Sequence, residues 1–164
     1  RIGNLRRLRH FFVAGNRLEV LPPSFGDLTE LYRVVLDGNS LRKLPDTLGN
    51  LNCRYFNVNN NRLVALPHCL KDMPRLQILA ANSNELQFLP SDIGYSASIV
   101  QMHLASNQLI QLPESICRMT KLKVLWLDHN NITGLPTRFH DLKSLEKLLL
   151  ERNDMVYPPP EIVR

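Results

Sequence analysis

Hydrophobic residues along this chain recur at fixed distances from a series of asparagines. Around Asn130, apolar side chains stand 8, 5 and 3 residues before it and 2 and 5 residues after it, and a proline follows at the sixth residue. We number each repeat from this asparagine, which is position 0. The frame returns every 23 residues, with one interval of 22, around Asn16, Asn39, Asn61, Asn84, Asn107, Asn130 and Asn153. Seven copies in one frame predict an array of stacked structural repeats.

Apolar positions −5 and −3 alternate with positions −6, −4 and −2, which is the period of a β-strand with one buried face. Successive strands are far enough apart in sequence for parallel crossovers, so we expect one parallel sheet. The column at −3 that should be buried is Val13, Leu36, Val58, Ala81, Leu104, Leu127 and Leu150. The predicted strands lie near residues 9–14, 32–37, 54–59, 77–82, 100–105, 123–128 and 146–151.

The repeated asparagine and the repeated proline each have a physical reason. An asparagine side chain both donates and accepts hydrogen bonds. Stacked in a ladder, these side chains can satisfy backbone groups that are freed where the chain turns out of the strand. Proline at position +6 fixes φ and lacks an N–H donor. It therefore favours an irregular or short helical return segment over a second sheet.

The period of about 23 residues and the pattern L-x-x-L-x-L-x-x-N-x-L predict an α/β fold, the leucine-rich repeat solenoid. This is a curved horseshoe with a parallel sheet on the concave face and irregular, 3-10 or short helical segments on the convex face. We expect residues 1–164 to form a single leucine-rich repeat domain of about seven repeats. Because Ile2 and Ile162 both occupy position +9, we expect the chain to be cut inside a repeat at both ends.

Three places depart from the repeat. The third repeat is one residue short between Leu51 and Cys53, and we expect the outer face to absorb the difference. Ser96 stands where other repeats carry leucine, and Tyr95 is expected to cover the gap. Pro158 replaces the leucine at position +5 of the last repeat, which predicts a change of path there.

The composition is that of a globular domain, with 164 residues, 44% hydrophobic and 21% charged, and a modest net charge of +5. No apolar run approaches the ~18 residues that a membrane span needs. The three cysteines contain no C-x-x-C pair, and Cys53 occupies an apolar position, so it is expected to be a small core residue. Cysteine-stapled end caps, common in extracellular repeat domains of this kind, are not visible. A reducing, intracellular (cytoplasmic) location is therefore predicted.

No constellation of catalytic or metal-binding residues appears in the sequence. The five histidines have no recognised ligand spacing, and the adjacent pair His68-Cys69 is a poor metal signal. Phosphate-binding loops and nucleophile motifs are also absent. The sequence therefore predicts no enzyme activity, no cofactor and no metal site.

The outward-facing strand positions offer a binding surface instead. Several residues at position −4 are large and apolar, although the backbone needs none there, and apolar patches with polar rims often mark interfaces. Tryptophan and tyrosine favour anchor roles, and charges at position −2 could set specificity. Scattered exposed apolar residues are also common on monomers. The candidate partner-binding residues are Phe12, Arg33, Val35, Asp37, Tyr55, Ile78, His103, Val124, Trp126, Asp128, Lys147, Leu149 and Glu151.

The repeats, well illustrated by residues 109–119 (LIQLPESICRM), resemble the intracellular leucine-rich repeat class of Scribble/Erbin-type scaffolds and the Ras-pathway scaffold. The resemblance implies non-catalytic protein binding through the concave face, in a scaffold or signalling protein. The alternative is a regulatory array attached to a kinase, GTPase or phosphatase. Nucleic acid is not an expected partner, because Asp37, Asp128 and Glu151 interrupt the concave wall. The pattern does not specify which protein is bound.

Overall fold

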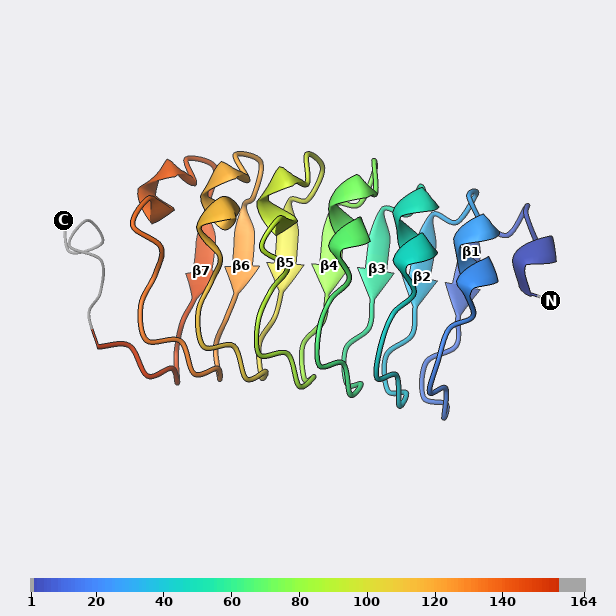
Figure 1. The fold of residues 1–164 in the computed structure, drawn as a ribbon, viewed down its shortest axis with the longest axis horizontal. Helices are drawn as coiled ribbons and strands as arrows, with labels where there is room; N and C mark the ends of the chain where they lie inside the picture. The colour runs from blue at the N-terminus through green and yellow to red at the C-terminus, as the bar shows by residue number, and fades with distance from the viewer. Residues whose placement is uncertain (1, 157–164) are drawn as a thin grey trace.

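The computed structural model describes residues 2–156, which form a row of stacked coils (Figure 1). Each coil pairs a short strand on one face with a 3-10 helix on the other. The described strands form one parallel sheet in chain order. The strands are β1 (His10–Phe12), β2 (Arg33–Val35), β3 (Tyr55–Asn57), β4 (Ile78–Ala80), β5 (Gln101–His103), β6 (Val124–Trp126) and β7 (Lys147–Leu149). The 3-10 helices are η1 (Ile2–Asn4), η2 (Pro23–Asp27), η3 (Asp46–Asn50), η4 (His68–Asp72), η5 (Ile93–Tyr95), η6 (Glu114–Arg118) and η7 (Phe139–Asp141).

The strands pair without a register slip. His10 of β1 faces Arg33 of β2, and Arg33 in turn faces Tyr55 of β3, although the repeat between them is one residue shorter. A slip by one residue would turn the buried positions −5 and −3 to solvent, so the register is strongly held. Each position of the repeat therefore forms a straight column across the sheet.

The observed strands span positions −6 to −4 and are shorter than the predicted ones, which ran from −7 to −2. Ladder hydrogen bonds continue past β2, where Leu36 N–H donates to the Asn57 carbonyl at 2.8 Å. At position −1 the backbone then enters the left-handed region, as at Gly38 with φ of 65° and His129 with φ of 56°. Left-handed residues cannot continue an extended chain, so the chain turns away from the sheet at this position.

The asparagine ladder predicted from the sequence is present. The Nδ2 of Asn61 donates to the carbonyls of Val58 in its own repeat and Leu36 in the preceding repeat, at 3.1 and 3.0 Å. Its Oδ1 accepts from the N–H of Leu41, also in the preceding repeat, at 3.0 Å. The same arrangement recurs at the other inner asparagines. Each side chain thus ties its own turn to the neighbouring coil.

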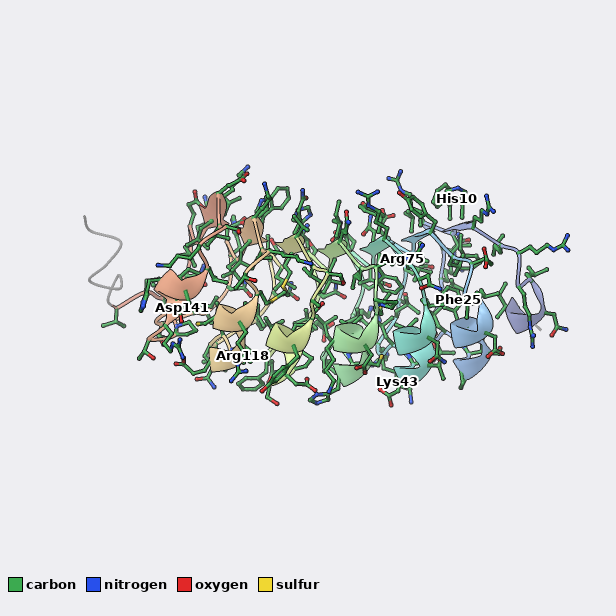
Figure 2. All side chains as sticks on the ribbon, turned by 90° about the horizontal axis from the view of Figure 1, so that it is seen from above. His10, Phe25, Lys43, Arg75, Arg118 and Asp141 are labelled. Carbon is green, nitrogen blue, oxygen red and sulfur yellow. The ribbon has the colours of Figure 1, made fainter. Side chains whose placement is uncertain are left out.

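The hydrophobic core fills the space between the sheet and the 3-10 helices (Figure 2). Phe25 of η2 lies between the two layers in that view, and it is almost completely buried. The five inner residues of the −3 column are buried, while Val13 and Leu150 at its ends are only partly so. Cys53 is a core residue as predicted, and burial raises the pKa of its thiol to about 12.

The irregular repeats have different outcomes. The shorter third repeat leaves the strand pairing intact, with Arg33 of β2 opposite Tyr55 of β3, so the missing residue is accommodated outside the strands. The expectation for Tyr95 is wrong, because this side chain is 58% exposed and Ser96 is itself buried beside the core. The expectations for Pro158 and Ile162 lie outside the described residues.

Candidate functional site

The concave wall consists of the outward-facing columns −6, −4 and −2. Because side chains alternate along each strand, these columns lie opposite the buried −5 and −3 columns. Ala80 in the −4 column is buried, since a methyl group rises too little from the sheet. The structure places the predicted partner-binding residues on this wall, and none of them is fully buried. Exposed are Phe12, Arg33, Lys147 and Glu151, and half-buried are Val35, Asp37, Tyr55, Ile78, His103, Val124, Trp126, Asp128 and Leu149.

Three neighbouring repeats build a stack of side chains near one end of the wall. The rings of His103 on β5 and Trp126 on β6 lie 3.9 Å apart, with an angle of 14° between their planes. The Lys147 ammonium on β7 lies 5.4 Å from the centre of the Trp126 ring. The strands β5, β6 and β7 lie side by side, which is why His103 meets Trp126, 23 positions later, and Trp126 meets Lys147, 21 positions later. We call this group the aromatic stack.

The aromatic stack has polar atoms without partners. His103 Nε2, Trp126 Nε1 and Asp128 Oδ1 are buried side-chain atoms that form no hydrogen bond with any described residue. The other Asp128 oxygen, Oδ2, lies 3.1 Å from His129 Nδ1. An unsatisfied buried polar group costs about 1–3 kcal/mol. This part of the wall is therefore less well satisfied than the asparagine ladder beneath it.

The ionisation of His103 follows from its place in the stack. Burial, and secondarily the positive charge of Lys147, lowers the pKa of the His103 imidazole. Both effects disfavour the protonated form. The imidazole at the face of Trp126 is therefore neutral near neutral pH. Among the described residues, Lys147 is then the only cation against the Trp126 ring.

The other end of the wall carries a second aromatic group built around Arg33. Its guanidinium carbon lies 4.6 Å from the ring centre of Tyr55 and 5.8 Å from that of Phe12. His10 packs beside Phe12, with their ring centres 5.8 Å apart. Phe12 remains 58% exposed. The two ends of the wall therefore share one composition, a cation held against aromatic rings.

Two polar residues of the −2 column serve the sheet itself. Asn59 Oδ1 accepts a hydrogen bond from the Asn82 N–H at 2.7 Å, and Asn82 Oδ1 accepts from the Ala105 N–H at 2.8 Å. These oxygens are therefore engaged within the wall. Two adjacent repeats with asparagine at −2 were a sequence signal for this second, shorter ladder. The charged residues Asp37 and Glu151 of this column form no such side-chain bond within the described residues.

Position −7, just before each strand, is missing from the predicted set, although its side chains border the wall. Arg54 donates from Nε to Gln77 Oε1 at 2.7 Å and from Nη1 to the Tyr32 hydroxyl at 3.1 Å. These three residues stand at the same position in successive repeats. The alternation of outward-facing and buried residues does not reveal them, because position −7 comes just before the alternating positions −6 to −2.

Nucleophilic and metal chemistry finds little support in the geometry. The pKa values of the Cys53, Cys69 and Cys117 thiols are all raised, mainly by burial, whereas reactive cysteines need a lowered pKa. Across residues 2–156, no group of three or more His, Cys, Asp or Glu side chains is placed to hold a metal ion. The helices in the same part of the chain are too short and too polar to cross a membrane.

Comparison with known proteins supports the repeat architecture. Residues 97–155 match the family model described as leucine rich repeat. A leucine-rich repeat protein of Leptospira interrogans has a similar structure, with a TM-score of 0.94 and 31% identity, over 99% of this chain and 42% of that one. This chain therefore spans less than half the length of that protein. A search of curated proteins finds no match.

Two other solved structures share the fold. YopM, a leucine-rich effector protein from Yersinia pestis, has a TM-score of 0.77 and 30% identity over 94% of this chain and 41% of that one. PEPR1, in the PEPR1–AtPEP1 structure, has a TM-score of 0.80 and 30% identity over 93% of this chain and 22% of that one. The family match, the structural likeness and the observed register lead to one conclusion: the chain folds as a leucine-rich repeat solenoid, an architecture that generally serves as a non-catalytic protein-interaction module.

Proposed function

We propose that this chain binds a protein partner through its concave wall, as part of an intracellular scaffold or signalling protein. The observation that carries the proposal is the aromatic stack of His103, Trp126 and Lys147. The leucine-rich repeat needs no tryptophan at position −4 for its core. Trp126 instead stands on the open side of the sheet, where interface anchors are commonly tryptophan, tyrosine and arginine.

The extent of the wall favours a protein over a small molecule. Arg33 on β2 and Trp126 on β6 are four strand spacings apart, which is about 19 Å at the usual spacing of parallel strands. Half-buried apolar residues such as Val35 and Ile78 lie between them. A ligand that contacts both cation–aromatic groups must span this distance, as a folded surface or an extended segment does.

The proposed location inside the cell is supported by the cysteines. Cys53, Cys69 and Cys117 are all free thiols. Free thiols persist most readily in a reducing compartment. A tagged chain expressed in its own cells should fractionate with the cytosol, and recovery in the secreted fraction would reject this part of the proposal.

The concave-wall proposal is tested by titrating a purified partner, first identified by affinity capture, against two alanine variants. Trp126→Ala should weaken binding by at least ~2 kcal/mol, the usual threshold for an anchor residue. Tyr95→Ala is the matched control, because Tyr95 is likewise an aromatic residue with a cation beside its ring, Arg118 at 5.0 Å, but it stands exposed on η5 in the convex layer.

Circular dichroism must first show that both variants are folded. Because the Trp126 ring is half-buried against His103, its truncation also costs stability, about 1–2 kcal/mol by the usual worth of aromatic and cation–π contacts. Equal partner affinity for the wild type and a folded Trp126→Ala variant would reject the concave wall. A loss caused by Tyr95→Ala alone would move the binding site to the convex face.

A further inference from the structure

The edge of the sheet where the chain enters the strands carries a row of exposed cations. They occupy positions −9 to −6 of five repeats, and the paired strands hold them side by side. Figure 2 looks down on this edge, with His10 on the strand side and Arg75 nearer the middle. We call this row the basic rim: Arg9, Arg33, Arg54, Arg75, Lys121 and Lys123, all of them exposed.

Few carboxylates balance the basic rim. At the same positions the acidic residues are Glu30 and Glu146. Glu146 is already paired with Lys123, with 2.7 Å between Nζ and Oε1. Within residues 2–156, the other rim cations form no ion pair. The rim therefore holds an uncompensated positive charge, although the net charge of the whole chain is only +5.

The opposite edge of the wall differs in sign. Position −2, where the chain leaves the strands, carries Asp37, Asp128 and Glu151. The flanking position +1 mixes cations such as Arg17 and Arg62 with anions such as Glu85. The two long edges of the concave wall therefore differ in charge, and positive charge is concentrated along one of them only.

The cations border shallow grooves. One groove is lined by Arg9, His10, Tyr32 and Arg75, among others. A second continues from Tyr32 and Arg75 towards Val100 and Lys121. Glu30 also lines the first groove, and polar residues such as Asn52 and Gln77 lie between the cations. A ligand lying along the rim would meet cations separated by polar and apolar side chains.

We infer that the basic rim binds an extended acidic segment of the protein partner, an inference that rests on the function proposed above. From Arg9 to Lys123 the rim crosses five strand spacings, about 24 Å. An extended peptide advances about 3.3 Å per residue, so about seven residues follow the rim. Alternate side chains of such a peptide face the same way, so carboxylates at every second residue would all face the cations.

The same geometry fits nucleic acid less well. A polynucleotide is wider than a single peptide strand, and its bases would reach across the wall. On the far side it would meet the carboxylates of Asp37 and Asp128, which repel phosphates. The ring of Tyr55 is also covered by Arg33, so it offers no free face for a base.

The inference is tested by fluorescence anisotropy with a labelled twelve-residue peptide of alternating glutamate and serine. The full 164-residue chain should bind it, and the lysine–serine counterpart should not bind. Raising the salt concentration from about 50 mM to 500 mM should weaken binding at least ~10-fold, because salt screens exposed charges. Equal binding of both peptides, or no binding of the acidic one, would overturn the inference.

Two charge-reversed double variants locate the site. Arg54→Glu with Arg75→Glu should weaken peptide binding at least ~10-fold, whereas Arg17→Glu with Arg62→Glu should change it less than ~2-fold. Both variants change the net charge equally, and all four arginines are exposed. Equal losses would mean a non-specific charge effect and would overturn the inference. If the rim variant fails to fold, Lys121→Glu alone should still weaken binding measurably.

A twelve-nucleotide oligothymidylate tests whether the rim prefers nucleic acid to an acidic peptide. Tighter binding of this probe than of the acidic peptide, with loss in the rim variant, would assign the rim to nucleic acid instead. Trp126→Ala separates the inference from the proposed function, because it should bind the glutamate–serine peptide normally and still lose the protein partner. If the wild-type chain fails to bind the peptide while Trp126→Ala still loses the protein partner, the rim inference is overturned and the proposed function stays intact.

Discussion

Replacing Asn107 by alanine tests how strongly the asparagine ladder joins the repeats. The Nδ2 of Asn107 donates to the carbonyls of Leu104 and Ala81 at 3.0 and 2.9 Å, and more weakly to that of Ala105 at 3.2 Å. Its Oδ1 accepts from the buried N–H of Leu86 at 3.1 Å. Two of these partners belong to the preceding repeat. Alanine removes all of these bonds, but the three carbonyls keep other donors: Asn84 Nδ2 for Ala81, Asn130 Nδ2 for Leu104 and the Ser83 N–H for Ala105. The buried N–H of Leu86 is left unpaired.

The magnitude follows from these bonds. A typical intramolecular hydrogen bond contributes about 0.5–1.5 kcal/mol, and a buried group left unpaired costs about 1–3 kcal/mol. We therefore expect Asn107→Ala to lower the free energy of unfolding by about 2–4 kcal/mol, of which about 1–3 kcal/mol comes from the unpaired N–H of Leu86 and about 1 kcal/mol from the lost bonds to carbonyls that keep another donor. Asn16 is a natural control, because it is exposed and, among residues 2–156, its side chain bonds only the carbonyls of Val13 and Ala14 in its own repeat. Asn16→Ala should cost less than about 1.5 kcal/mol.

Urea denaturation followed by far-ultraviolet circular dichroism measures both variants. If unfolding stays cooperative, the free energy of unfolding should fall with urea concentration at the same slope in each variant, so that the midpoints report stability. Equal losses for Asn107→Ala and Asn16→Ala would show that bonds to the neighbouring repeat contribute nothing. A loss below about 1 kcal/mol for Asn107→Ala would refute the reasoning from unpaired buried groups.

Other parts of the structure can be tested in the same way. Leu127→Ala should cost about 2–5 kcal/mol in urea denaturation, because Leu127 is fully buried, and Leu150→Ala should cost clearly less, because Leu150 is only partly buried. The folded pKa of His103 lies below its ordinary value of 6.5, so the unfolded chain takes up the proton first and stability is lost as pH falls below about 6.5. His103→Gln should show a smaller loss between about pH 7 and 5 in thermal denaturation, and an identical slope would contradict the assigned burial. Cys53 should resist iodoacetamide at pH 8 until the chain unfolds, as checked by mass spectrometry, because its pKa is about 12.

The features that repeat could be predicted from the sequence, because each copy constrains the others. Seven asparagines at one position predicted a ladder, and its bonds are present between neighbouring repeats. Leu127 and its column were correctly placed inside, because a period of two allows only one face to be buried. The length of the strands was overestimated, because alternation fixes which face is buried but not where regular pairing stops, and the strands end at position −4.

The features that occur once were harder to predict. Register brings His103 and Trp126 to neighbouring strands, but it does not fix the side-chain torsions that stack their rings. Tyr95 was expected beside Ser96 because the two are neighbours in sequence, and the helix η5 instead directs it to solvent. The basic rim was overlooked for another reason. Its residues lie at positions −9, −7 and −6, so they gather only after the coil has brought three different positions to one edge.

The aromatic stack and the basic rim should act at different stages of binding. The ladder and the paired strands hold their side chains on a stiff frame, so the chain loses little conformational freedom when a partner arrives. Exposed charges mainly raise the rate of association, whereas a desolvated aromatic anchor mainly slows dissociation. Reversal of Arg54 and Arg75 should therefore lower the association rate and its dependence on salt. Truncation of Trp126 should leave association nearly unchanged and speed dissociation, and this division distinguishes two cooperating surfaces from one continuous patch.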